Sequence, residues 1–161
     1  MAETNADPTQ VTLPSDDQIL VTREFDAPRQ LVYRAWTEPE LVKRWWCGHY
    51  GTVTVAEIDP VAGGRWRYVI AVPESGEAGF HGEYREIVPG ERIVTTEVPE
   101  AADAVTRLTT ITFTEADGRT TLTYHVSAGN REERDAIIAS GLEIGLREQL
   151  EVLEKVIAEL R

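Results

Sequence analysis

The sequence contains few of the features by which several protein classes are identified. Cys47 is the only cysteine among the 161 residues, so no internal disulfide can form, and a reducing compartment such as the cytoplasm is expected. No apolar stretch approaches the roughly 20 residues that a membrane-spanning helix needs. The polar N-terminus also lacks the apolar segment of a signal peptide. The sequence therefore predicts a soluble cytoplasmic protein without a membrane partner.

Positive charge is scarce as well. Lysine and arginine together number 16 against 28 aspartates and glutamates, which gives a formal net charge of -12 at pH 7. Such a chain repels polyanions, because phosphate backbones and anionic lipids carry charge of the same sign. The composition therefore argues against nucleic acid as the main partner.

Motifs for catalysis or metal binding are missing too. Cys47 and His49 are two possible metal ligands, but no nearby Cys or His completes a tetrahedral set, so neither a metal site nor a cofactor is expected. The sequence has no nucleophile elbow, zinc-protease helix or phosphate-binding loop. No catalytic residue is identified, and binding is favoured over catalysis.

What is present is a clear order of predicted elements. Residues 1–16 are polar and aperiodic and read as a flexible tail, which leaves a single domain over residues 17–161. Residues 19–25 alternate as a half-buried strand, and Arg23 lies on the apolar face of that strand. Two short helices follow, each with a proline, Pro28 or Pro39, in its first turn. Trp45 and Trp46 end this helical block.

The next part of the chain reads as an antiparallel meander of short strands separated by proline and glycine turns. One face of these strands is rich in aromatic residues. For the strand at residues 106–114, the sequence does not decide which face points inward. The predicted strands span residues 52–58, 65–72, 78–88, 92–98, 106–114 and 120–127.

From residue 131 to residue 160 the apolar period returns to that of one long helix, about 45 Å in length. Gly145 and Gln149 interrupt its apolar stripe one turn apart. They indicate the wall of a cavity that has a polar spot. The alternative is that Gly145 allows close packing against the sheet and Gln149 bonds a tyrosine hydroxyl or a buried water.

The order of elements predicts an α+β fold: a curved antiparallel sheet of about seven strands, two short helices after the first strand, and a long C-terminal helix. A cavity between helix and sheet would be mainly apolar with a few polar groups. The alternative for each aromatic residue is ordinary core packing. The predicted ligand-binding residues are Trp36, Trp45, Trp66, Tyr68, Phe80, Tyr84, Leu122, Tyr124, Leu142, Gly145 and Gln149.

Several strings in register resemble one family. They are PRQLVYRAWTEPELVKRWW (28–46), Gly63-Gly64-Arg65-Trp66, His81-Gly82-Glu83-Tyr84, Pro89-Gly90-Glu91-Arg92-Ile93-Val94, Ser140-Gly141-Leu142 and Leu146-Arg147-Glu148-Gln149. From about residue 20 onward the chain is similar to the single-domain homologues of the heat-shock-protein ATPase activator (Aha-type). These belong to the START-like SRPBCC superfamily, whose helix-grip fold is shared with the birch pollen allergen. The chain departs from the family pattern at Leu142, Gln149 and Leu150.

The resemblance implies an internal cavity, often apolar, with diverse ligands. The expected function is therefore binding of a small hydrophobic or amphipathic molecule. Two alternatives stay open: a cyclase- or lyase-like enzyme of the same superfamily, or a stress-related interaction module like a co-chaperone. A chaperone partner is not expected, because in the eukaryotic co-chaperone a separate domain makes much of that contact. Exposed edge strands leave a weak homodimer open.

Overall fold

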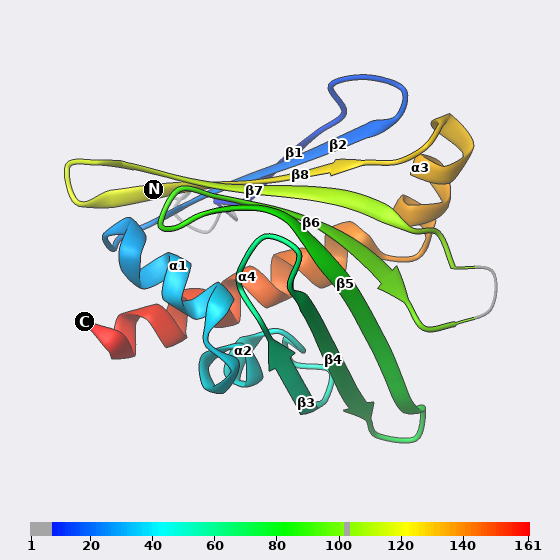
Figure 1. The fold of residues 1–161 in the computed structure, drawn as a ribbon, viewed down its shortest axis with the longest axis horizontal. Helices are drawn as coiled ribbons and strands as arrows, with labels where there is room; N and C mark the ends of the chain where they lie inside the picture. Colours follow the sequence, from blue (N-terminus) through cyan, green and yellow to red (C-terminus); the bar gives the residue numbers. More distant parts are fainter. Residues whose placement is uncertain (1–7, 102–103) are drawn as a thin grey trace, which may run out of the picture.

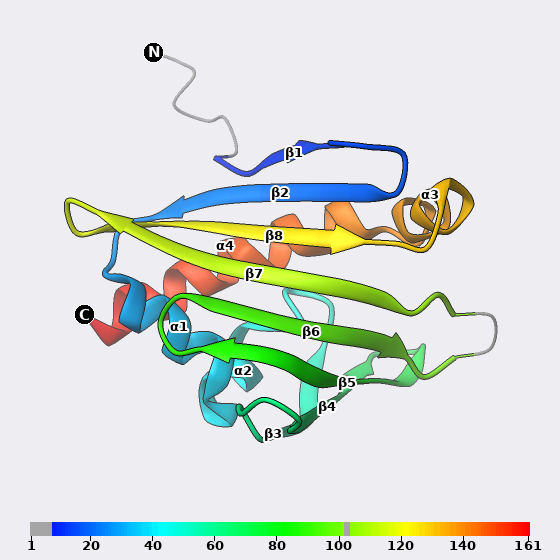
Figure 2. The same ribbon diagram turned by 45° about the horizontal axis from the view of Figure 1, so that its top comes forward.

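Within residues 8–101 and 104–161, the part of the chain that the computed structural model describes, eight antiparallel strands form one curved sheet. The C-terminal helix α4 lies along one face of this sheet, with α1 and α2 beside it (Figure 1). The strand order is β1-β2-β8-β7-β6-β5-β4-β3, so the strand before the first helix pairs with the last strand (Figure 2). This is the predicted helix-grip arrangement.

The structure gives the bounds of each element. The strands are β1 (Gln10–Thr12), β2 (Gln18–Phe25), β3 (Thr52–Ile58), β4 (Arg65–Val72), β5 (Gly76–Val88), β6 (Arg92–Pro99), β7 (Arg107–Ala116) and β8 (Arg119–Ser127). The helices are α1 (Arg29–Thr37), α2 (Pro39–Trp45), α3 (Arg131–Ala139) and α4 (Leu142–Leu160). No helix in these described ranges is both long enough and apolar enough to cross a membrane.

The eighth strand lies where the sequence predicts a flexible tail. Gln10–Thr12 pairs antiparallel with β2, and Thr9 is buried beside it. Arg23 of β2 points inward and donates a hydrogen bond of 3.0 Å to Thr9 Oγ1. The prediction of a flexible tail is therefore wrong for residues 9–12, because the inward side chain of Arg23 binds this polar segment. Residues 1–7 of the predicted tail lie outside the described residues.

The long C-terminal helix is present as predicted, but it begins at residue 142 and not at residue 131. The chain turns at Gly141, whose φ of +95° lies in the left-handed region, and the turn separates α3 from α4. Glycine adopts this conformation without a steric penalty and commonly ends a helix. The apolar period does not reveal the turn, because it continues in both helices. The 19 residues of α4 span about 28 Å, shorter than the length of about 45 Å expected for one helix over residues 131–160.

The open question of which face of β7 points inward is settled by burial. Thr109, Ile111 and Phe113 are buried, and Ile111 lies opposite Tyr124 of β8 in the sheet. Arg107 lies on the same face as these residues, since side chains two apart in a strand point to the same side. The inner face of β7 therefore carries one arginine at its end.

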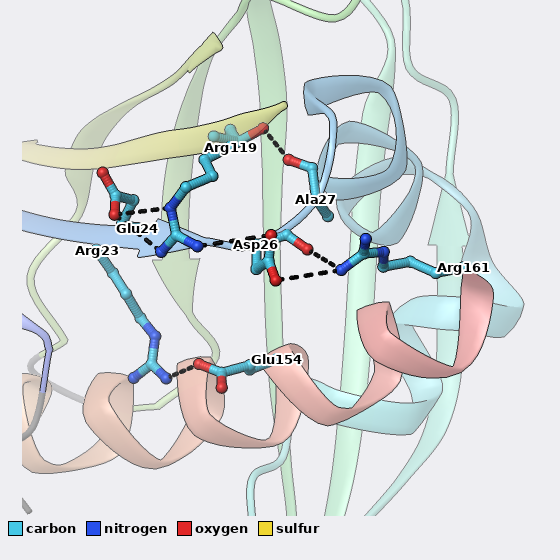
Figure 3. A network of polar contacts seen from close by, with 8 residues as sticks. Arg23, Glu24, Asp26, Ala27, Arg119, Glu154 and Arg161 are labelled. Carbon is cyan, nitrogen blue, oxygen red and sulfur yellow. Dashed lines mark hydrogen bonds and ion pairs between the residues drawn. The ribbon is translucent and has the colours of Figure 1, made fainter. Parts of the chain in front are cut away.

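Charged residues tie the end of α4 to the sheet (Figure 3). Asp26 forms ion pairs of 3.5 Å with Arg119 and 3.4 Å with Arg161, and Arg161 also donates to the Asp26 carbonyl. Arg23 forms a further ion pair with Glu154 of α4. Exposed ion pairs contribute little stability individually, so this network adds only modestly to the packing that holds α4 in place.

Candidate ligand cavity

A cavity of about 530 Å³ lies between α4 and the inner face of the sheet. Its walls come from α1, the segment after α2, strands β4 to β8 and the corner between α3 and α4. The lining residues are Trp36, Trp46, Cys47, Tyr50, Ile70, Val72, Ser75, Phe80, Glu97, Pro99, Arg107, Tyr124, Ser140, Gly141, Leu142, Gly145, Leu146 and Gln149.

Gly145 lies in the wall of this cavity. A Cβ atom placed on Gly145 would meet no other atom within 4 Å, apart from its chain neighbours and its own helix. The missing side chain therefore leaves open space and does not bring α4 closer to the sheet. Leu142 and Leu146, which are four residues apart in α4, line the same cavity. Of the two interpretations of Gly145 made from the sequence, the geometry favours the cavity.

Gln149 also lines the cavity and serves a structural purpose there. Its side-chain amide donates a hydrogen bond to the backbone carbonyl of Trp46. Just beyond, a Cβ on Gly48 would lie 3.4 Å from the Cβ of Glu148, so α4 and this segment pack closely. Gln149 thus joins α4 to the end of α2, through a backbone carbonyl and not through the tyrosine or water considered from the sequence.

The two adjacent tryptophans have different environments. Trp45 is 1% exposed and donates from Nε1 to the Ala35 carbonyl at 2.8 Å, so it belongs to the core and does not line the cavity. Trp46 lines the cavity, with its ring centroid 4.9 Å from that of Tyr68 and 5.0 Å from that of Phe80. Neighbouring helical residues point about 100° apart, so only one can face the cavity. Trp46, and not Trp45 as predicted, therefore lines the cavity.

The other sequence-predicted residues divide into three groups. Trp36, Phe80, Tyr124, Leu142, Gly145 and Gln149 line the large cavity. Trp66, Tyr68 and Tyr84 line a deeper space of about 30 Å³, which shares Trp36 and Tyr124 with the large cavity. This deeper space is large enough for a water molecule. Leu122 lines neither space; it is fully buried in the core.

Sequence reasoning missed an ion pair in the cavity wall. Arg107 Nη2 donates to Glu97 Oε2 at 2.6 Å, and both side chains are 10% exposed. Tyr124 Oη donates to Glu97 Oε1 at 3.3 Å. The inward direction of Glu97 could have been predicted, because Glu97 shares the alternation of Ile93 and Thr95 in its strand. The inward direction of Arg107 could not, because the sequence does not show which face of β7 points inward.

Burial and charge keep these side chains protonated. Burial raises the pKa of Tyr124 well above its usual range, and the Glu97 carboxylate raises it further. Burial alone would lower the pKa of Arg107, but the neighbouring Glu97 raises it overall. Tyr124 and Arg107 therefore act as hydrogen-bond donors at neutral pH.

Cys47 also lines the cavity. Burial raises the pKa of its thiol, which disfavours the reactive thiolate form. His49, which the sequence offers as a second metal ligand, lies 3.3 Å from Glu151 on the surface. Among the residues that the structure describes, no group of three His, Cys, Asp or Glu side chains could hold a metal ion.

Solved structures share this fold over nearly the whole chain. A protein from Rhodobacter sphaeroides is 25% identical with a TM-score of 0.87, and the match covers 95% of this chain and 99% of that one. For a protein from Chromobacterium violaceum the identity is 28%, the TM-score 0.78 and the coverage 89% and 98%. For one from Mycobacterium smegmatis these values are 21%, 0.84, 92% and 96%, a likeness of fold alone.

No curated protein matches the sequence of this chain. A family model does match it, over residues 26–158, and is described as Activator of Hsp90 ATPase homolog 1-like protein. The match runs from the residue after β2 to near the end of α4 and so includes every element that lines the cavity. The chain therefore belongs to the Activator of Hsp90 ATPase homolog 1-like protein family, with a START-like helix-grip fold.

Proposed function

We propose that this domain binds one small, mainly apolar molecule in the cavity between α4 and the sheet. The observation that carries the proposal is the cavity of about 530 Å³ beside Gly145. Ligand sites in proteins have volumes of about 300 to 1,000 Å³ and are lined by apolar side chains with a few placed polar groups. A domain whose purpose was only to present a surface would be expected to fill this space with side chains.

The cavity has chemically different regions. Trp46, Ile70, Phe80 and Leu146 supply apolar surface that a hydrocarbon or aromatic skeleton would cover. The ion pair of Glu97 with Arg107 supplies a polar region in the same wall. The ligand that fits this arrangement is apolar over most of its length and polar at one point.

The cavity also has a side from which a ligand can enter. Tyr50, Ser75 and Gly141 are exposed to solvent and belong to its wall. They come from the segment after α2, the turn between β4 and β5, and the corner between α3 and α4. A ligand would pass between these three loops, which can move more easily than the sheet.

The proposal is tested with N-phenyl-1-naphthylamine, an apolar probe whose fluorescence rises in a dry environment. We expect the purified protein to bind the probe, and a ligand at about 100 times its Kd to raise the Tm by about 5–10 °C. Gly145→Leu should abolish probe binding and leave the circular dichroism spectrum intact, because the new side chain occupies the cavity.

Gly145→Ala is the matched control, since it adds one methyl group and leaves most of the volume free. It should retain probe binding. The proposal fails if the native protein does not bind the probe, or if the leucine variant binds it as well as the native protein. If the leucine variant or the alanine variant does not fold, the result would support close packing at Gly145 instead of a cavity.

A further inference from the structure

The polar region of the cavity wall has more donors than acceptors. Glu97 has both carboxylate oxygens engaged, Oε2 by Arg107 and Oε1 by Tyr124. Arg107 has five N–H groups. Within the described residues, Glu97 is its hydrogen-bond partner, and the enclosed Nε of Arg107 has no acceptor. Both carboxylate oxygens are therefore already paired, while one N–H group of Arg107 is left without an acceptor.

A second orphan donor lies in the same wall. Trp36 is 8% exposed, and its Nε1 is enclosed without an acceptor in the described part of the chain. Two other buried tryptophans are satisfied: Trp45 donates to the Ala35 carbonyl and Trp66 donates to Thr95 Oγ1, each at 2.8 Å. Trp36 differs from them in that it lines the large cavity.

Such donors are rare because an unsatisfied buried N–H costs about 1–3 kcal/mol. The two residues that carry them, Trp36 of α1 and Arg107 of β7, line one cavity that has room for a ligand. We infer that the ligand carries a neutral carbonyl-type oxygen, and that this oxygen accepts hydrogen bonds from Arg107 and Trp36. The inference rests on the proposed function and specifies its ligand class: ketones, esters, lactones or amides with an apolar skeleton.

Charge distinguishes a neutral acceptor from an anionic one. Glu97 already neutralises Arg107 at 2.6 Å, so a ligand carboxylate at this point would be a second negative charge beside Glu97. Two carboxylates in an enclosed site repel, and desolvation adds to the cost. A ligand ammonium group can only donate hydrogen bonds, whereas the N–H groups of Arg107 and Trp36 need an acceptor. A carbonyl oxygen supplies the acceptor without charge.

The experiment measures competition against N-phenyl-1-naphthylamine by three compounds with the same twelve-carbon chain: dodecane, dodecan-2-one and dodecanoate. Dodecane gives the apolar reference. Because dodecane and the ketone differ in hydrophobicity, the decisive quantity is the change that a variant makes to each affinity, and not the affinities themselves.

Trp36→Phe keeps an aromatic ring and removes the N–H. It should weaken the binding of dodecan-2-one by about threefold to tenfold more than it weakens the binding of dodecane, because only the ketone loses a hydrogen bond. Arg107→Lys keeps a positive charge beside Glu97 and removes the Nε donor, so it should have the same selective effect. Trp45→Phe removes an N–H that does not line the cavity and should change neither affinity.

Three results overturn the inference: equal losses for dodecane and the ketone in Trp36→Phe, a similar selective loss in Trp45→Phe, or tighter binding of dodecanoate than of dodecan-2-one to the native protein. In each of these cases the cavity still binds apolar molecules, so the proposed function stands. If neither the probe nor dodecane binds, the proposed function fails as well. Should Arg107→Lys not fold, Trp36→Phe decides alone.

Discussion

Glu97 of β6 and Arg107 of β7 lie opposite each other in the sheet and form a 2.6 Å ion pair in the cavity wall. Each is 10% exposed, so each depends on the other to balance its charge. A pair of this kind contributes little net stability compared with apolar residues, but removing one member leaves the other uncompensated. The pair therefore makes its two positions interdependent.

The first prediction tests this dependence. Arg107→Met should lower the free energy of unfolding by about 2–4 kcal/mol, because it leaves the Glu97 carboxylate without a counter-ion. The double variant Glu97→Gln with Arg107→Met should recover most of that loss, since no charge is left in the wall. Urea denaturation of the three proteins measures both values, and a double variant less stable than the single one would contradict the interdependence.

The second prediction uses two glycines that differ in backbone conformation. A Cβ at Gly141 or at Gly145 meets no atom within 4 Å, but Gly141 has a φ of +95° whereas Gly145 is helical. Gly145→Ala should raise the free energy of unfolding by about 0.5–1 kcal/mol, because alanine favours the helix. Gly141→Ala should lower it by about 1 kcal/mol, because of the left-handed backbone. Effects of the same sign in urea denaturation would show that the corner is not a fixed left-handed turn.

The third prediction concerns the tryptophan rings of Trp36 and Trp45, which pack with centroids 4.5 Å apart. Trp45→Phe should lower the free energy of unfolding by about 1–3 kcal/mol, since the buried Ala35 carbonyl loses its donor. Trp36→Phe should cost less, because its Nε1 has no acceptor in the described residues. Thermal denaturation in the absence of added ligand compares them, and an equal loss would indicate that Trp36 is satisfied in solution.

The fourth prediction concerns acid. Glu100 accepts hydrogen bonds from Arg67 and lies 2.8 Å from His81, and these two partners hold the pKa of the Glu100 carboxyl at about 2. A pKa below that of the unfolded chain means that the carboxylate stabilises the fold above the unfolded pKa, and that this contribution is lost as the pH falls toward 2. Between pH 5 and pH 2.5 the native protein should therefore lose more stability than Glu100→Gln. Parallel losses in urea denaturation would exclude a role for this cluster.

Strand boundaries and burial patterns were predictable wherever alternation was strict. Residues 52–58 and 65–72 correspond to β3 and β4 without any change of bounds. The pattern failed where one residue changes the direction of the chain. Gly141 breaks the C-terminal helix, yet the apolar period on both sides is uninterrupted, so only the backbone angle reveals the corner.

For the cavity, the sequence indicated the side formed by α4 more clearly than the side formed by the sheet. Gly145 and Gln149 stand out because they interrupt the regular helical period of apolar residues. Trp45 and Leu122 are as apolar as the true lining residues, so nothing in their sequence context distinguishes core from cavity wall. Arg107 was hidden for a different reason, since its strand alternates threonine with apolar residues and either face could point inward.

The single cysteine gives this chain a reporter of its own. Cys47 belongs to the cavity wall and is 7% exposed, and burial raises the pKa of its thiol. Alkylation of this thiol by a small reagent should be slow, and slower still when the cavity is occupied. No competing thiol has to be removed, so mass spectrometry of the unmodified protein during alkylation becomes a direct screen for occupants of the cavity.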